Sequence, residues 1–194
     1  GALKQTEVKR LLAWSSIAHA GYILLAVGVW SELGATALMV YLVAYLFMNL
    51  AAFLLAGIVI RERGTGELKA FEGLGTRSPL LAAGFAVVLF SLTGLPPFLG
   101  FVGKMTVFYA VFDKGYFWLG VVGLLNGVIS LYYYAKILVR MYLTDGEPSD
   151  QPFTFQWADG VLVALLVVPI LVLGILWSPL YEVAQRVVPA VFGG

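Results

Sequence analysis

The 194-residue sequence contains no cysteine and a single histidine, His19. Without cysteine, the chain holds no disulfide framework, no thiolate zinc site and no iron–sulfur cluster. One histidine also argues against a haem or metal centre that needs several imidazole ligands. We therefore expect neither a metal site nor a cofactor site within this sequence.

Charged residues are scarce as well. They make up 12% of the chain, compared with about 25% in soluble domains. Hydrophobic residues make up 61%, and the mean hydropathy is +0.93. The net charge of +1 gives no reason to expect a nucleic-acid partner. This composition indicates a bundle surrounded by lipid.

No signal-peptide pattern is present. Because the sequence opens on Gly1 without an initiator Met, we interpret it as part of a longer polypeptide.

Long apolar segments give the predicted fold. A helix needs about 20 mostly apolar residues to cross the ~30 Å hydrocarbon core of a bilayer. Five segments are long enough: residues 11–30, 35–60, 79–112, 116–143 and 158–177. Residues 144–156 carry acidic residues and prolines and are predicted to form a loop, and residues 180–192 a short interfacial tail. The prediction is an all-α, polytopic membrane bundle of five transmembrane helices, with residues 1–194 forming one domain.

The third segment is too long for a straight span. Its 34 residues would reach about 51 Å as one helix. The sequence Gly94-Leu95-Pro96-Pro97 lies near its middle, and the two prolines remove backbone donors and clash with the preceding turn. We therefore predict one discontinuous span, with half-helices near residues 79–93 and 98–112.

Basic residues predict the orientation, since cytoplasmic loops carry an excess of Lys and Arg. Two basic residues, Lys114 and Arg186, fall on one side of the predicted bundle. The other side receives nine: Lys4, Lys9, Arg10, Arg61, Arg63, Lys69, Arg77, Lys136 and Arg140. The start of the chain is therefore predicted to be cytoplasmic and its C-terminus to lie on the opposite side.

Lys104 is the strongest candidate for a functional residue. It lies nine residues before Asp113, at the outer end of its predicted span, or about 13 Å deep. A lysine reaches headgroups only from near a span end, and an intramembrane charge costs at least about 2.5–3.5 kcal/mol. Gly94, Pro96, Pro97 and Gly100 place it beside the predicted break, as in ion sites of transporters. We interpret Lys104 as a proton-relay group. The alternative is a structural lysine that forms an ion pair with a carboxylate. However, every Asp and Glu in this sequence lies in a predicted loop or at the end of a predicted span.

Other polar residues within the spans are weaker candidates. His19 could link the cytoplasmic side to the midplane, or simply form an interhelical hydrogen bond. Tyr41, Tyr45 and Asn49 share one helix face at i, i+4 and i+8. That face could hold a polar path, although such stripes more often join helices. Lys136 could end a proton path, or its side chain could extend to the interface.

Three segments resemble the antiporter-like membrane subunits of respiratory complex I. They are residues 5–22 (QTEVKRLLAWSSIAHAGY), 91–104 (SLTGLPPFLGFVGK) and 126–134 (NGVISLYYY). The first two motifs are long and specific, and the third is supportive. Within the family, Lys104 on the broken helix, without a histidine pair at the positions of Tyr41 and Tyr45, resembles subunit N (subunit 2).

The resemblance implies a subunit of fourteen helices, of which this sequence would hold the last five, with the C-terminus outside. It implies proton translocation through Lys104 in the bacterial inner membrane, coupled to quinone reduction elsewhere in the complex. FMN, iron–sulfur clusters and quinone would belong to other subunits, and other membrane-arm subunits would be the partners. A glutamate and two lysines of the relay would lie upstream.

Two further hypotheses remain. One is a subunit of an Mrp-type sodium/proton antiporter or of a membrane-bound hydrogenase-type complex, which the absence of the histidine pair disfavours. The other is a structural scaffold in which Lys104 forms a salt bridge.

Overall fold

The structure is a computed structural model, and it describes residues 1–146 and 156–192, with side chains described as far as Pro189. Within this part of the chain every regular element is a helix, so the predicted all-α class is confirmed. The predicted loop at residues 144–156 falls largely on residues 147–155, which lie outside the described residues.

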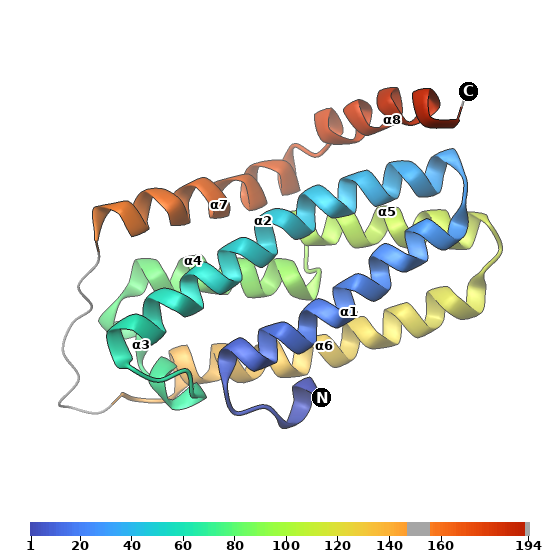
Figure 1. The fold of residues 1–194 in the computed structure, drawn as a ribbon. Coiled ribbons are helices and arrows are strands. Elements are labelled where there is room, and N and C mark those ends of the chain that lie inside the picture. Colours follow the sequence, from blue (N-terminus) through green and yellow to red (C-terminus); the bar gives the residue numbers. More distant parts are fainter. Residues whose placement is uncertain (147–155, 193–194) are drawn as a thin grey trace.

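Seven helices form the bundle in Figure 1. They are α1 (Val8–Val29), α2 (Glu32–Arg63), α4 (Pro79–Thr93), α5 (Leu99–Asp113), α6 (Phe117–Leu143), α7 (Trp157–Ile175) and α8 (Ser178–Phe192). Short turns of helix at η1 (Ala2–Lys4), η2 (Leu68–Phe71) and α3 (Leu74–Arg77) complete the described elements. Four helices, α1, α2, α6 and α7, are long and apolar enough to cross a bilayer. The chain is therefore a multi-pass membrane protein.

Helix α2 is the central element of the bundle. Its 32 residues correspond to about 48 Å at ~1.5 Å per residue, and it packs against α1, α4, α5, α7 and α8. Four alanines, Ala44, Ala51, Ala52 and Ala56, are completely or almost completely buried along it. Small side chains let neighbouring helix backbones approach closely, which is how membrane helices gain packing energy.

Gly94 separates α4 from α5. Its φ of +91° is a left-handed conformation that glycine adopts without steric cost. The last residue of α4 is Thr93, directly before this glycine. Helix α5 begins at Leu99. The side chain of Ser91, in the last turn of α4, accepts a hydrogen bond from the backbone N–H of Gly100 at 2.9 Å. A side chain of one helix thus satisfies a backbone donor at the start of the other.

The segment predicted as an interfacial tail is instead part of α8, which packs along the first half of α2. Ala184 is 3% exposed and forms a small apolar cluster with Val40 of α2 and Val102 of α5. The prediction missed this packing because residues 180–192 are short and mix apolar with polar residues, and such a pattern does not say which surface its apolar side covers. The structure buries the narrow apolar stripe of α8 against other helices and leaves Glu182 and Arg186 exposed.

Helices α7 and α8 together run the length of the bundle beside α2 (Figure 1). Gly174, in the last turn of α7, packs against the interrupted segment between α4 and α5: a Cβ atom at Gly174 would lie 2.3 Å from the carbonyl oxygen of Pro97. The interval between α7 and α8 therefore lies beside the interval between α4 and α5.

Two ion pairs join separate segments at the end of the bundle where the basic residues gather. Arg61 of α2 donates to both carboxylate oxygens of Asp159 in the first turn of α7, at 2.5 and 3.3 Å. Arg140 of α6 pairs with Glu72, just after η2. The first pair joins α2 to α7, and the second joins α6 to the segment between η2 and α3.

Candidate functional site

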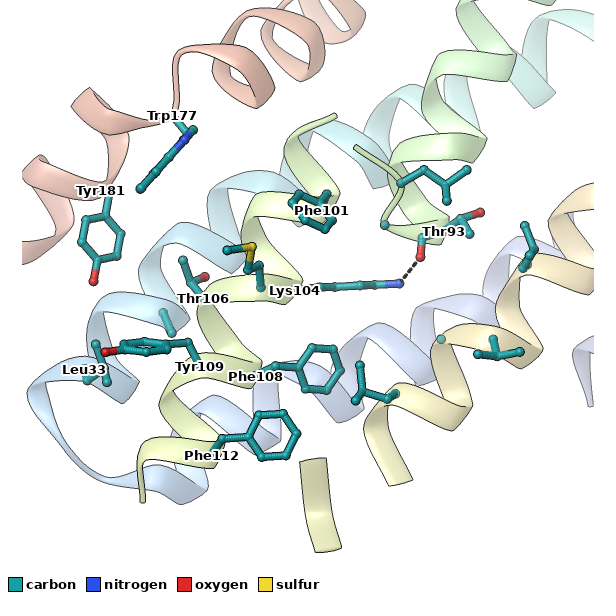
Figure 2. Close-up of a pocket in the computed structure, with 18 residues that line it drawn as sticks. Leu33, Thr93, Phe101, Lys104, Thr106, Phe108, Tyr109, Phe112, Trp177 and Tyr181 are labelled. Atoms are coloured by element: carbon teal, nitrogen blue, oxygen red, sulfur yellow. Dashed lines mark hydrogen bonds between the residues drawn. The ribbon is translucent and has the colours of Figure 1, made fainter. Parts of the chain in front are cut away.

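Lys104 of α5 forms hydrogen bonds with the C-terminal end of α4. Its Nζ atom donates to the carbonyl oxygens of Leu92, at 2.9 Å, and of Thr93, at 2.7 Å. The side chain is only 6% exposed. Figure 2 shows it extending across the interval between the two helices toward Thr93.

The hydrogen bonds at the end of α4 explain why Lys104 binds there. The last carbonyl groups of a helix have no intrahelical partner and must be satisfied otherwise. The carbonyl of Phe90 accepts from Gly94 and Leu95, and that of Ser91 accepts from Gly94. The carbonyls of Leu92 and Thr93 remain, and the lysine occupies both. The partial negative charge at a helix C-terminus favours a cation at this position.

Within the described residues, no carboxylate forms an ion pair with Lys104. The carboxylates of Glu7, Glu72 and Asp159, for example, pair with arginines instead. What faces the ammonium group is the ring of Tyr22 on α1, whose centroid lies 4.9 Å from Nζ. The structure therefore surrounds the lysine with carbonyl dipoles and an aromatic face.

His19 lies at a junction of three helices. Its Nδ1 atom is 2.7 Å from the hydroxyl of Tyr41 on α2, and its Nε2 atom is 3.3 Å from the hydroxyl of Tyr134 on α6. The imidazole is 2% exposed, and its ring also contacts the ring of Tyr22 at 6.0 Å between centroids. His19 and Lys104 therefore both lie beside Tyr22.

The predicted polar face of α2 turns toward α1. Tyr41 is fully buried and binds His19, and the ring of Tyr45 stacks on His19 at 5.3 Å between centroids. Asn49 continues the stripe, because its Oδ1 atom accepts a hydrogen bond from Ser16 at 3.3 Å. These contacts join α1 to α2. A role of this face in proton transfer stays a prediction.

Lys136 lies apart from this cluster. Its Nζ atom donates to the carbonyl of Leu3 at 2.5 Å and lies 5.0 Å from the centroid of the Tyr132 ring. The hydrogen bond to Leu3 ties the C-terminal half of α6 to the start of the chain. It does not touch Lys104.

The glycines and the prolines predicted at the break have different structural roles. A Cβ atom at Gly94 would lie 2.7 Å from Cδ of Lys104, and one at Gly100 would lie 1.8 Å from the carbonyl oxygen of Ser91. The absence of a side chain at Gly94 thus lets the Lys104 side chain approach the backbone, and its absence at Gly100 lets the backbones of α4 and α5 approach each other. Pro96 and Pro97 are exposed in the connecting turn, and the carbonyl of Pro97 contacts Gly174.

A pocket of about 730 Å³ opens beside Lys104 between α5, α6 and α8. Its lining is largely apolar, with Phe101, Phe108 and Phe112 on one wall. Trp177, which directly precedes α8, and Tyr181 of α8 also line the pocket; in the view of Figure 2 they lie on the other side of α5 from Phe108 and Phe112. Lys104 contributes the charged group of this lining.

Sequence reasoning missed three partners in the site. Tyr134 and Tyr22 were part of recognised motifs, but the contacts of each depend on how α1 and α6 pack. The carbonyl groups of α4 carry no side-chain signature at all. The one available signal was the predicted break, since a helix that ended inside a membrane would leave carbonyl groups that need a donor.

The sequence model of the family described as NADH:quinone oxidoreductase/Mrp antiporter, TM matches residues 1–130. The chain belongs to this family of membrane proteins. It is 48% identical over 189 residues to NADH-quinone oxidoreductase subunit N 2 of Sorangium cellulosum, an alignment that covers 95% of this chain and 37% of that protein. The predicted resemblance to subunit N is thereby confirmed.

Two solved structures have similar folds. A chain of respiratory complex I from Thermus thermophilus with bound aureothin gives a TM-score of 0.78 at 35% identity, over 93% of this chain and 41% of that one. A chain of the Mrp complex from Dietzia sp. DQ12-45-1b gives a TM-score of 0.91 at 24% identity, over 97% of this chain and 43% of that one. This second likeness concerns the fold alone. The chain thus spans less than half the length of each relative.

Proposed function

We propose that this chain forms part of a proton-translocating membrane subunit of an NADH–quinone oxidoreductase, and that Lys104 is a proton-relay group within it. The observation that carries the proposal is the pair of hydrogen bonds from Nζ to the free carbonyl groups of Leu92 and Thr93. Family membership and the similarity to subunit N support the same function.

The geometry suits reversible protonation. A lysine ammonium group carries three N–H donors, and two of them satisfy the carbonyl groups of α4. After loss of one proton, the neutral amine still has two N–H bonds and gains a lone pair. The amine can therefore keep both bonds to α4 while the third position releases and accepts the proton. A carboxylate partner, in contrast, would hold the charged form.

Helices α4 and α5 act, in this proposal, as one discontinuous crossing among five. Each has 15 residues, or about 22 Å, so neither alone spans a ~30 Å core comfortably. The excess of basic residues places the start of the chain in the cytoplasm and the C-terminus in the periplasm of a bacterial inner membrane.

His19 and Lys136 have supporting roles in the proposal. His19 lies beside the same Tyr22 ring as Lys104 and titrates near neutral pH in water, so it is the nearest candidate to exchange protons with the lysine, with Tyr41, Tyr45 and Asn49 as a polar path beside it. Lys136 binds Leu3 at the inner side and would act at the path's cytoplasmic end.

Redox chemistry, in this proposal, belongs to other subunits. FMN, iron–sulfur clusters and quinone would be bound elsewhere, and the neighbouring membrane-arm subunits would transmit the effect of quinone reduction to Lys104. The chain supplies the proton path and no redox group.

The test uses the intact complex that contains the full-length subunit. Lys104→Ala, Lys104→Arg and, as a matched control, Lys114→Ala in the outer turn would be reconstituted in liposomes. We expect Lys104→Ala to lower the number of protons moved per NADH oxidised, and Lys114→Ala to leave it unchanged. Unchanged pumping by a normally assembled Lys104→Ala complex would contradict the proposal.

A second candidate is a subunit of an Mrp-type antiporter, because the family description names both classes. Sodium-driven proton movement without NADH oxidation would favour this candidate. Co-purification with flavin and iron–sulfur subunits would favour the oxidoreductase.

A further inference from the structure

The ring of Tyr22 is positioned on the ammonium group of Lys104. Its centroid lies 4.9 Å from Nζ, inside the ~6 Å range in which an aromatic face attracts a cation. Tyr22 is 2% exposed and Lys104 6% exposed. The contact is therefore shielded from solvent, the condition in which a cation–π interaction is strongest.

Three contacts fix the orientation of this ring. The hydroxyl of Tyr22 donates to the carbonyl of Gly123 on α6 at 3.1 Å, and Nδ2 of Asn126 donates to the same hydroxyl at 3.5 Å. The ring of Phe108 on α5 meets that of Tyr22 edge to face, at 5.8 Å and 85°. Tyr22 thus reaches from α1 to α6 with its face held toward α5.

Few other ionisable groups face Lys104. Tyr22 and His19 face it from α1, and Tyr41 of α2 packs on the ring of Tyr22. Tyr109 of α5 and Tyr181 of α8 line the same pocket, whose lining among the described residues includes no residue of α7. The backbone of α4 supplies carbonyl groups, and the α6 residues of the pocket lining have no ionisable side chain. Among these groups, the Tyr22 ring is the one in direct contact with the ammonium group.

We propose that Tyr22 is a positioning residue whose ring face stands in for a carboxylate counter-ion of Lys104. The ring stabilises the ammonium form and holds Nζ against the carbonyl groups of Leu92 and Thr93. An aromatic face attracts the cation but cannot accept its proton, so it favours the charged group without forming a competing acid–base pair. This inference deepens the proposed function and rests on it where it concerns proton transfer.

The experiment measures the protonation of Lys104 directly, in the purified complex. Only a neutral amine reacts with acetic anhydride, so short pulses of this membrane-permeant reagent at different pH values, followed by peptide mass spectrometry, give a labelling curve for Lys104. We expect Tyr22→Leu and Tyr22→Met to move the midpoint of this curve by about one pH unit toward lower pH, the change expected when an interaction of cation–π strength is lost. Lys114, in the outer turn, gives the reference curve within each sample.

Two control variants separate the ring face from its surroundings. Tyr22→Phe keeps the face and removes the hydroxyl, and we expect its midpoint to stay close to that of the wild type. Phe108→Leu removes one of the three contacts that hold the ring but keeps the ring face, so its midpoint should move less than that of Tyr22→Leu. Coinciding curves for wild type, Tyr22→Leu and Tyr22→Met would overturn the inference, and so would an equal shift in Tyr22→Phe.

Proton pumping supplies the second readout. If Lys104 relays protons, the pH profile of pumping in Tyr22→Leu should move in the same direction as its labelling curve, whereas that of Tyr22→Phe should not. A shifted labelling curve with pumping that is insensitive to Lys104→Ala would contradict the proposed function and leave the role of Tyr22 standing. Unshifted labelling with pumping that requires Lys104 would do the reverse.

Discussion

Gly100, in the first turn of α5, lies directly against the backbone carbonyl of Ser91 in the last turn of α4. A Cβ atom at Gly100 would be 1.8 Å from that oxygen and 2.7 Å from Sδ of Met48. The two helix ends overlap side by side, and the overlap brings Lys104, one turn further along α5, to the free carbonyl groups of α4.

Gly100→Ala should therefore destabilise the protein. The added methyl group has to displace backbone and not only a flexible side chain, and overpacking of this kind costs about 1–3 kcal/mol. We expect a lower midpoint temperature of thermal unfolding in detergent, together with reduced pumping. Gly21→Ala on α1 is the control, since a Cβ atom there meets nothing within 4 Å. Equal midpoints for Gly100→Ala and the wild type would contradict the close packing.

His19→Leu tests the junction of α1, α2 and α6. The substitution removes the imidazole that contacts the hydroxyls of Tyr41 and Tyr134. Interhelical hydrogen bonds in membranes contribute about 0.6–1.7 kcal/mol each, so a moderate loss of stability is expected. Tyr41→Phe should cost less, and the double variant should cost less than the sum of the two, because both remove the same bond. Strict additivity in unfolding measurements would show that the contact contributes no energy.

The Arg61–Asp159 ion pair should stabilise the packing of α2 against α7, and this stabilisation should depend on salt. Arg61→Asp or Asp159→Arg places like charges together and should lower the thermal midpoint at low ionic strength. The double exchange should recover most of the loss. The effect should be small, because the Arg61 side chain is 45% exposed, and it should shrink further in high salt. A salt-independent loss would point to packing and not to charge.

Ala184→Leu tests the position of α8. Ala184 is 3% exposed between Val40 and Val102, so a larger side chain should push α8 away from α2 and lower the thermal midpoint. Val183→Leu, on the neighbouring exposed position, should be neutral. If α8 were instead a tail on the surface of the bundle, the two variants would have equal thermal midpoints.

The long helices and the interruption at Gly94 were predictable, because hydropathy and proline chemistry act locally. The predicted bounds of the four long apolar helices differ from those of α1, α2, α6 and α7 by a few residues. Lys104 could be singled out for the same reason, since a charge in an apolar segment is visible in the sequence alone.

The contacts of Lys104 could not be predicted. Its hydrogen-bond acceptors are backbone atoms of Leu92 and Thr93, and any residue would present the same oxygen atoms. The place of α8 was missed because an amphipathic pattern does not say which apolar surface it covers. Tyr22 was read as part of a motif, whereas its part in the site comes from the tilt of α1 against α5 and α6.

The contact of Gly174 with Pro97 has a mechanical consequence. Because a Cβ atom at Gly174 would overlap the carbonyl of Pro97 and the backbone of Leu99, the two backbones have no free space between them at this point. A sideways movement of the last turn of α7 toward this contact would therefore have to displace the turn that precedes α5. Helix α7 thus ends against the start of the helix that carries Lys104, so the position of its last turn is mechanically coupled to that of α5.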